Sequence, residues 1–472
     1  MSDWSYAELE QAVKRALRVL EQYVKESREG QSPVVPLRPV AEIIAELGLK
    51  HWVESGSMDS ETFESFLVQY LAHSTRMHHP AYMAHQVAVP DSPAALADLI
   101  HGVINNPMAI YEMGPSAAAV ELVVIDWMLE KVGWGGSGQP KGTGVLTHGG
   151  SLANLTALLA ARAQADPGAW DNGTSDNLVI LAPPSSHYSI RRAASIIGIG
   201  TRGVLSVEVD DKEVIVPDRL PDAVKQARDE GKQVMAVVAN ACATSTGLHD
   251  PLGELGSFCR EEGLWLHVDG AHGASALVSK KERWLLRGVE KADSLTWDAH
   301  KMLRTSGLCT AVLFREAHAL DRAFQQKASY LFYGDEKSGV DLIGRTVECT
   351  KTALGLKVFL NLAWRGEKGL ARYVENQYDL ARRFQKRIES RKDFECPYPT
   401  ESNILCFRYK DDDDLQVAIR DRLLEEGRFH ITSTEVHGKR YLRLTVMSPQ
   451  TTAETIDGLL DAIERISKEF VA

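Results

Sequence analysis

Apolar residues recur at helical spacing near the start of the chain, each three or four residues after the last. This spacing predicts an amphipathic helix over residues 3–29, which ends at Gly30 and Pro33. Its apolar positions are Leu9, Val13, Leu17, Leu20 and Val24. Such a face needs a surface to cover, and we expect the chain's own core or a second subunit rather than a lipid surface.

From about residue 90 the pattern changes to short, almost continuous apolar runs separated by helical stretches. The predicted strands lie in the segments GVLTHGG, NLVILAP, GVLSVEV, QVMAVVAN, LWLHVDG, DSLTWDAH and LCTAVLF. The predicted helices between them cover residues 152–163, 189–197 and 222–230. Strands that alternate with crossover helices predict a mostly parallel sheet covered on both faces. Apolar runs without polar alternation are typical of strands buried in this way.

The end of the chain has a different pattern. After Arg345 the periodicity predicts a long helix to Leu362 and a second helix over residues 369–390. The strand-like segments ESNILCFRY and RYLRLTV follow, with predicted helices over 414–426 and 453–470. The chain therefore divides into three predicted parts: an N-terminal helical segment (1–90), a large α/β domain (91–345) and a small α+β domain (346–472).

Composition excludes several classes of protein. Of the 472 residues, 44% are hydrophobic and 25% charged, which is ordinary for a globular chain with a substantial core. A formal net charge of −11 makes nucleic acid a poor partner. The N-terminus has no secretory signal, and no apolar run reaches the roughly 18 residues expected of a membrane span. Six cysteines without a C-x-x-C pair indicate a reduced cytoplasmic protein without a structural metal site.

Four segments place reactive residues where predicted strands end, which is where open parallel sheets bind ligands. In the segment THGGSLAN, two glycines precede a helix that begins at Ser151, an arrangement that suits a phosphate or an ordinary helix cap. In DSLTWDAHKML, Lys301 follows a strand in apolar surroundings, which favour the neutral amine needed for a Schiff base, although most lysines simply lie at the surface.

The other two segments carry an acid and an imidazole. Asp269 ends a strongly apolar strand, so its carboxylate needs either a structural ion pair or a cationic ring nitrogen as its partner. His187, in SSHYSIRRA, lies where a strand gives way to a helix. It suits stacking over a flat ring, and a helix-capping or core histidine is the alternative.

Taken together, these segments resemble the group II amino acid decarboxylases. HVDGAHGASALVS and SLTWDAHKML are similar to glutamate and cysteine sulfinate decarboxylases, and HHPAYMAHQ is similar to bacterial diaminobutyrate-type members. Further similar segments are ACATSTGLHDPL, ASYLF and GRTVECTKTALGLK. The resemblance covers about residues 70–450. It implies an α/β fold of the pyridoxal phosphate fold type I, with a mostly parallel seven-stranded sheet in the large domain, and a homodimer with its active site at the interface.

The resemblance also implies roles for the residues around the cofactor, pyridoxal 5′-phosphate. Lys301 would form the Schiff base, Asp269 would pair with the pyridine nitrogen, Ala271 would lie under the ring and His187 would stack above it. The implied phosphate ligands are Gly150, Ser151 and His300. Thr244 would lie near the ring hydroxyl or His187.

For the substrate, the resemblance implies that Arg443 binds the α-carboxylate and that Gln86 or His85 contacts the rest of the molecule. The implied reaction is α-decarboxylation of an L-amino acid to the amine and CO2 through a quinonoid intermediate. Which amino acid is used stays open between acidic and basic or aromatic substrates.

Several alternatives stay open. The segment YGDEKSGVDLI, residues 333–343, is shorter than the family's catalytic loop and holds only Tyr333 as a candidate proton donor, which keeps a decarboxylating aldehyde synthase open. His272 and Asp298 also differ from the residues usual in close relatives. A carbon–carbon lyase, an aminotransferase and a pyridoxal phosphate protein without catalysis are the remaining alternatives.

Overall fold

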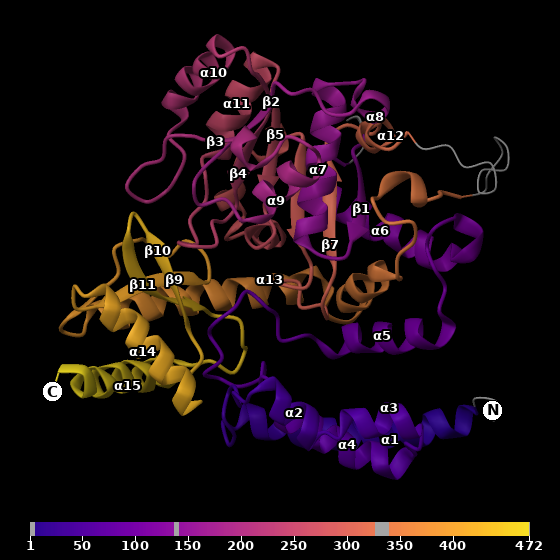
Figure 1. Ribbon diagram of the computed structural model, residues 1–472, viewed down its shortest axis with the longest axis vertical. Helices are drawn as coiled ribbons and strands as arrows, with labels where there is room; N and C mark the ends of the chain where they lie inside the picture. Colours follow the sequence, from indigo (N-terminus) through magenta and orange to yellow (C-terminus); the bar gives the residue numbers. More distant parts are fainter. Residues whose placement is uncertain (1–4, 136–140, 326–338, 472) are drawn as a thin grey trace. The chain divides into compact units, whose positions relative to one another are not determined.

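The computed structural model describes residues 5–135, 141–325 and 339–471 (Figure 1). The chain forms two compact units. One unit consists of the residues up to His85, 382–397 and those from Cys406 onward, and the other consists of 86–381 and 398–405. The three-part division and its boundaries stay a prediction.

The larger unit is built on a seven-stranded sheet with the strand order β1-β7-β6-β5-β4-β2-β3. Only β7 runs antiparallel to its neighbours. The strands are β1 (Thr143–Thr147), β2 (Leu178–Ala182), β3 (Val204–Ser206), β4 (Gln233–Asn240), β5 (Trp265–Asp269), β6 (Ser294–Asp298) and β7 (Thr310–Phe314). Six of them lie within predicted segments, and β1 begins one residue before its segment, so the mostly parallel sheet expected from the apolar runs is confirmed.

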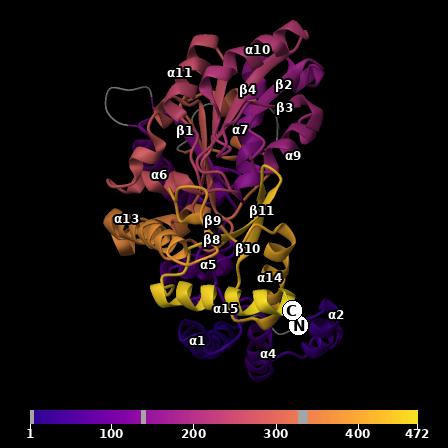
Figure 2. The same ribbon diagram turned by 90° about the vertical axis from the view of Figure 1, so that its left-hand side faces the viewer.

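Residues at successive positions of a strand point to opposite faces of the sheet. Since the strands are apolar at both sets of positions, helices cover both faces. On one face Val145 and Val312 belong to a core shared with α7 (Gly150–Ala165), which runs along the near side of the sheet in Figure 1. On the other face Gly144 lies against Leu313 and against Ile125 of α6 (Pro115–Val132). Figure 2 shows the strands between α6 and α9.

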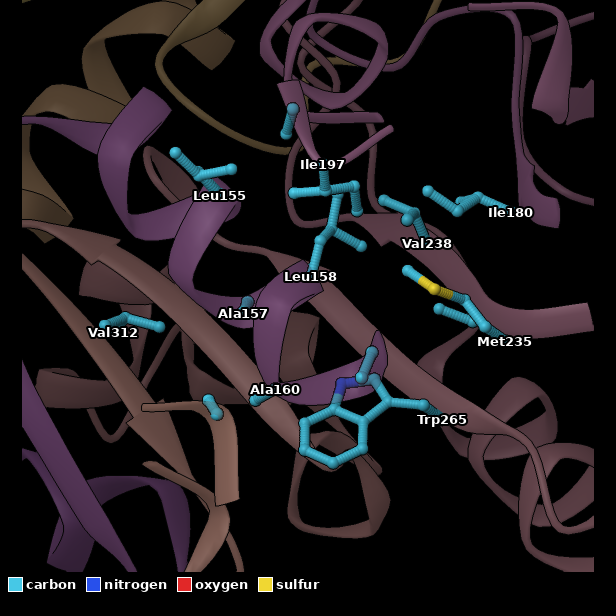
Figure 3. Packing of buried hydrophobic residues seen from close by; sticks show 14 of the residues in the cluster. Leu155, Ala157, Leu158, Ala160, Ile180, Ile197, Met235, Val238, Trp265 and Val312 are labelled. Carbon is cyan, nitrogen blue, oxygen red and sulfur yellow. The ribbon is translucent and has the colours of Figure 1, made fainter. Parts of the chain in front are cut away.

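The core on the α7 face is dense and apolar (Figure 3). Leu155 and Leu158 of α7 meet Ile197, Met235 and Trp265 there, all at most 9% exposed. This packing fixes α7 against the sheet and so fixes the position of its N-terminus. The further helices of this unit are α5 (Ser92–Ile104), α8 (Ala169–Asn172), α9 (Ser189–Ile196), α10 (Leu220–Asp229), α11 (Leu252–Glu262), α12 (Ala319–Ala323) and most of α13 (Leu354–Glu389).

The helix predicted to begin at Arg345 begins at Leu354 instead, so its predicted start was wrong. Residues 346–353 are not helical. A buried ion pair between Lys351 and Glu121 of α6 fixes this segment against β1, and such a distant contact leaves no mark on local periodicity. The predicted interruption between two helices is present, because Gly366 has a non-helical backbone inside α13.

The smaller unit contains helices from both ends of the chain and most of a four-stranded sheet of order β10-β11-β9-β8. Its helices are α1 (Tyr6–Arg28), α2 (Val40–Glu46), α3 (Leu49–Ser55), α4 (Ser60–Ala72), α14 (Asp413–Glu426) and α15 (Ala453–Val471). Its strands are β8 (Phe394–Glu395), β9 (Ile404–Tyr409), β10 (Thr432–Val436) and β11 (Lys439–Thr445). Ser5 and Glu8 form a capping box that starts α1 as an amphipathic helix.

Within the described ranges, no helix is both long enough and apolar enough to cross a lipid bilayer.

Candidate active site

One cavity in the larger unit collects most of the predicted site residues. Nine of the eleven line it, from segments that lie far apart in the sequence: Gln86, Gly150, Ser151, His187, Thr244, Asp269, Ala271, His300 and Lys301. Five further residues complete the lining: Asn154, Asn240, Cys242, His272 and Asp298. The strand register explains the convergence, since Asn240 and Asp269 are direct neighbours at the carboxyl ends of β4 and β5. Asp269 is in turn paired with Thr296 of β6, two residues before that strand ends at Asp298.

The turn after β1 forms one wall of the cavity. Gly149 has a φ of +103°, a conformation that side chains disfavour, and α7 begins at the next residue. A Cβ on Gly150 would lie 3.1 Å from Oδ1 of Asp298, so a side chain there would press on this buried carboxylate. Gly150 and Ser151, the first two residues of this 16-residue helix, line the cavity, and their backbone N–H groups have no helical acceptor, which is an arrangement suited to an anion.

Lys301 lies just after β6, and its side-chain nitrogen is 3.0 Å from Oδ2 of Asp298. Burial alone would raise the pKa of Asp298. Lys301, His300 and the Thr310 hydroxyl together outweigh burial, so the pKa lies below its ordinary value. The Thr310 hydroxyl donates to Oδ1 at 2.6 Å. Asp298 is therefore a buried carboxylate that holds the lysine in place.

Asp269 is 7% exposed at the end of β5. Its Oδ1 accepts the backbone N–H of Ala271 at 3.2 Å, and its Oδ2 accepts the side-chain amide of Asn154 at 2.9 Å. The carboxylate is thereby held in one orientation at the edge of the cavity.

His187 precedes α9, and its Nδ1 lies 2.8 Å from the Ser189 hydroxyl. Burial lowers the pKa of His187, an effect that the charge of Asp269 opposes only in part. The ring is therefore neutral at neutral pH. His300 places its Nδ1 2.9 Å from the carbonyl oxygen of Cys309 and its Nε2 3.6 Å from Oδ2 of Asp298.

His85 and Arg443, the other two predicted residues, belong to the smaller unit. Arg443 lies on β11, is 6% exposed, and donates to the carbonyl oxygen of Ala84 and the hydroxyl of Thr432, each at 3.3 Å. His85 is exposed, with its ring centroid 5.4 Å from that of His430. Tyr333, the candidate proton donor, lies outside the described residues.

Five residues that line the cavity were missed as site residues by sequence reasoning, and two of them carried a usable signal. Asp298 was noted only as a departure from relatives, although an acid that ends an apolar strand three residues before a lysine is a usable signal. Asn154 lies in the first turns of α7 and is only 1% exposed, and a polar residue on a buried helical face is the signal that could have found it.

The donor set fits pyridoxal phosphate. An amine, a buried carboxylate, a helix N-terminus behind two glycines and a neutral imidazole line one cavity. These groups match an aldehyde, a protonated ring nitrogen, a phosphate and a flat ring respectively.

Known proteins agree with this geometry. The conserved domain of pyridoxal-dependent decarboxylases matches residues 58–410. The chain is 31% identical over 418 residues to the acidic amino acid decarboxylase GADL1 of Mus musculus, covering 84% of this chain and 75% of the relative. It is 30% identical over 422 residues to the cysteine sulfinic acid decarboxylase of Homo sapiens, covering 85% and 84%. A crystal structure of mouse CSAD superimposes with a TM-score of 0.89 at 25% identity, covering 97% of this chain and 99% of the other.

Proposed function

The chain belongs to the pyridoxal-dependent decarboxylases, carboxy-lyases whose cofactor is pyridoxal phosphate, and we propose that it removes the α-carboxylate of an L-amino acid with Lys301 as its reactive amine. The observation that carries the proposal is the single cavity lined by Lys301, Asp269 and the N-terminus of α7. The products would be the corresponding amine and CO2.

The residues that line the cavity would then have different roles. The bound cofactor supplies a protonated ring that takes up the electron pair left when CO2 departs. Asp269 would keep the proton on the ring nitrogen, because its ionised carboxylate favours a neighbouring positive charge. Gly150, Ser151 and His300 would hold the phosphate, with Thr244 at the ring hydroxyl or near His187.

The two faces of the ring would be covered by His187 and Ala271. A neutral imidazole suits this role, because it packs flat without adding a charge that would compete with the ring nitrogen for Asp269. Lys301 would hold the cofactor between turnovers and return to it as the amine product leaves. Asp298 would keep the lysine amine close to the reacting carbon by ion pairing.

Substrate orientation decides which bond to the α-carbon breaks. Arg443 would bind the α-carboxylate through its planar guanidinium group, which fits a carboxylate with two parallel hydrogen bonds. Gln86 or His85 would contact the remainder of the substrate. For the proton returned to the α-carbon, Tyr333 is the candidate donor within the segment 333–343.

We further propose a cytoplasmic homodimer in which the N-terminal helices pack across the two subunits and the active site lies at their interface. The cysteine usage, six residues without a C-x-x-C pair, and the exposed apolar residues Leu17 and Leu20 of α1 support this arrangement. Size-exclusion chromatography with light scattering tests it, and an active monomer would contradict it.

The substrate is proposed from the relatives. Because two of them act on an acidic amino acid or on cysteine sulfinic acid by name, amino acids with an anionic side chain are our first candidates. The test is CO2 release from a panel of the common amino acids with cysteine sulfinate and diaminobutyrate. Release of CO2 from none of them would overturn the proposed decarboxylase.

The short segment 333–343 supports a second candidate, a decarboxylating aldehyde synthase. If no side chain returns a proton to the α-carbon, O2 would take up the electron pair left by CO2 and become hydrogen peroxide, and hydrolysis of the resulting imine would release an aldehyde and ammonia. Measuring aldehyde and hydrogen peroxide beside amine and CO2 separates the two activities. Stoichiometric peroxide would favour the synthase, and an amine yield equal to the CO2 released would exclude it.

A further inference from the structure

Asn154 lines the cavity and lies at the centre of a chain of buried polar side chains. Its carbonyl oxygen accepts from Nε2 of His267 at 3.1 Å and from the Thr296 hydroxyl at 2.7 Å. Its amide nitrogen donates to Oδ2 of Asp269 and to the Ser189 hydroxyl, each at 2.9 Å. An asparagine side chain offers two donors and two acceptor positions, so every one is used here.

The direction of these bonds follows from one group that can only accept. The carboxylate of Asp269 accepts from the NH2 group of Asn154, so the carbonyl oxygen of Asn154 faces the other way, toward Nε2 of His267 at 3.1 Å. His267 therefore carries its proton on Nε2 and donates it to Asn154. Nδ1 of His267 is then an acceptor for the Ser294 hydroxyl at 2.9 Å, which itself accepts from the indole N–H of Trp265 at 2.8 Å.

The same reasoning continues to His187. Ser189 accepts from Asn154, so its hydroxyl proton is available for Nδ1 of His187 at 2.8 Å. The backbone N–H of Ser189 also points at that nitrogen, at 3.3 Å. With two donors directed at Nδ1, the ring proton of His187 lies on Nε2.

We propose that Asn154 is a positioning residue that sets two features of the cofactor site together, the orientation of the Asp269 carboxylate and the tautomer of His187. Asn154 is assigned no direct contact with the cofactor. Its importance for turnover rests on the proposed function of Asp269 and His187. Asn154 and Ser189 are each only 1% exposed. Water is therefore kept from replacing the hydrogen bond that is lost when either side chain is removed.

The test compares Asn154→Leu and Ser189→Ala with Asn361→Leu. Asn361 is a matched control because it is also 1% exposed in the same unit, and its amide donates to the backbone carbonyls of Leu303 and Arg304 rather than to cavity residues. The first readout is the ¹⁵N spectrum of histidine-labelled apo-protein, with the His187 signals assigned by their loss in His187→Gln. The second is the affinity of the apo-protein for pyridoxal phosphate.

In the wild type and in Asn361→Leu we expect the His187 ring protonated on Nε2. In Asn154→Leu and Ser189→Ala we expect a mixture of tautomers. Cofactor affinity should fall at least tenfold in Asn154→Leu beyond any loss in the control, and by less in Ser189→Ala, which keeps the bond to Asp269. An unchanged His187 tautomer in both variants, or equal affinity losses in Asn154→Leu and Asn361→Leu, would overturn the proposal.

Ser189→Ala tests the tautomer alone should Asn154→Leu fail to fold. Failure of the proposed function would show differently, as a wild type that binds the cofactor but releases no CO2. The tautomer measurement uses no cofactor or substrate, so its result stands in either case.

Discussion

The side-chain nitrogen of Lys301 lies 3.0 Å from Oδ2 of Asp298, whose side chain is 3% exposed. The lysine thus has a structural partner in addition to its proposed chemistry. Removing one member of a buried ion pair leaves an uncompensated charge, which typically costs about 3–5 kcal/mol. Substitutions at both residues can therefore separate the effect of Lys301 on folding from its effect on catalysis.

We predict that Lys301→Ala abolishes CO2 release and lowers the free energy of unfolding of the apo-protein by about 3 kcal/mol. Adding Asp298→Asn should restore most of the stability and none of the activity. Urea unfolding followed by circular dichroism measures the first effect. Lys357→Ala is the control, because its partner Asp98 has a side chain 49% exposed and the pair should contribute less than about 1 kcal/mol. Equal losses in the two single variants would contradict the prediction.

Arg443→Lys should raise KM by about 10- to 100-fold with a smaller change in kcat. The lysine keeps the positive charge but loses the second parallel hydrogen bond to a carboxylate, and hydrogen bonds to charged groups are worth about 1.5–3 kcal/mol. Steady-state kinetics with the amino acid found in the substrate panel provides the measurement. A fall in kcat at constant KM would instead assign Arg443 to a step after binding.

The sequence predicted the sheet well because its strands are short, buried on both faces and separated by helices, so each strand is a local feature. Five of the nine predicted residues in the cavity lie at strand ends, which converge in this kind of sheet: Gly150, Ser151, His187, Asp269 and Lys301. The other four, Gln86, Thr244, Ala271 and His300, were implied by the resemblance to the family. Asn154 and Ser189 were missed because their importance comes from each other and from Asp269, 115 residues from Asn154. The start of α13 was missed for the same reason, since a contact between residues 121 and 351 decides it.

The stability of the fold should fall as the pH is lowered through the titration range of His267. Burial lowers the pKa of His267 to about 4, although the charge of Asp269 opposes this effect. An unfolded histidine titrates near pH 6.5, so between these values the unfolded chain binds the extra proton and is favoured. His267 therefore stabilises the fold above pH 6.5, and this contribution is lost as the pH falls toward 4.

Between pH 7 and pH 5 the loss from His267 should be about 2 kcal/mol. Urea unfolding of the apo-protein at both pH values measures it against His267→Gln, which cannot titrate. Between these pH values the free energy of unfolding of the variant should change by about 2 kcal/mol less than that of the wild type, whatever its absolute stability. The same pH dependence in both proteins would show that another group is responsible.

The last prediction concerns Lys351 and Glu121, whose side chains are 0% and 2% exposed. Lys351 also donates to the carbonyl oxygen of Leu146 at 2.6 Å, and the backbone N–H of Leu146 donates to Oε1 of Glu121 at 3.0 Å. The pair thus fixes residues 346–353 to β1, directly before the turn that begins the proposed phosphate site.

Lys351→Met should therefore lower the free energy of unfolding by about 3–5 kcal/mol, because it leaves the carboxylate of Glu121 buried and unpaired. Adding Glu121→Gln should recover most of that loss, since the amide oxygen can still accept from Leu146 while the buried charge is gone. Urea unfolding of the two variants beside the wild type gives both values. A single variant as stable as the wild type would show that water reaches Glu121, and the ion pair would then not explain why the helix begins only at Leu354.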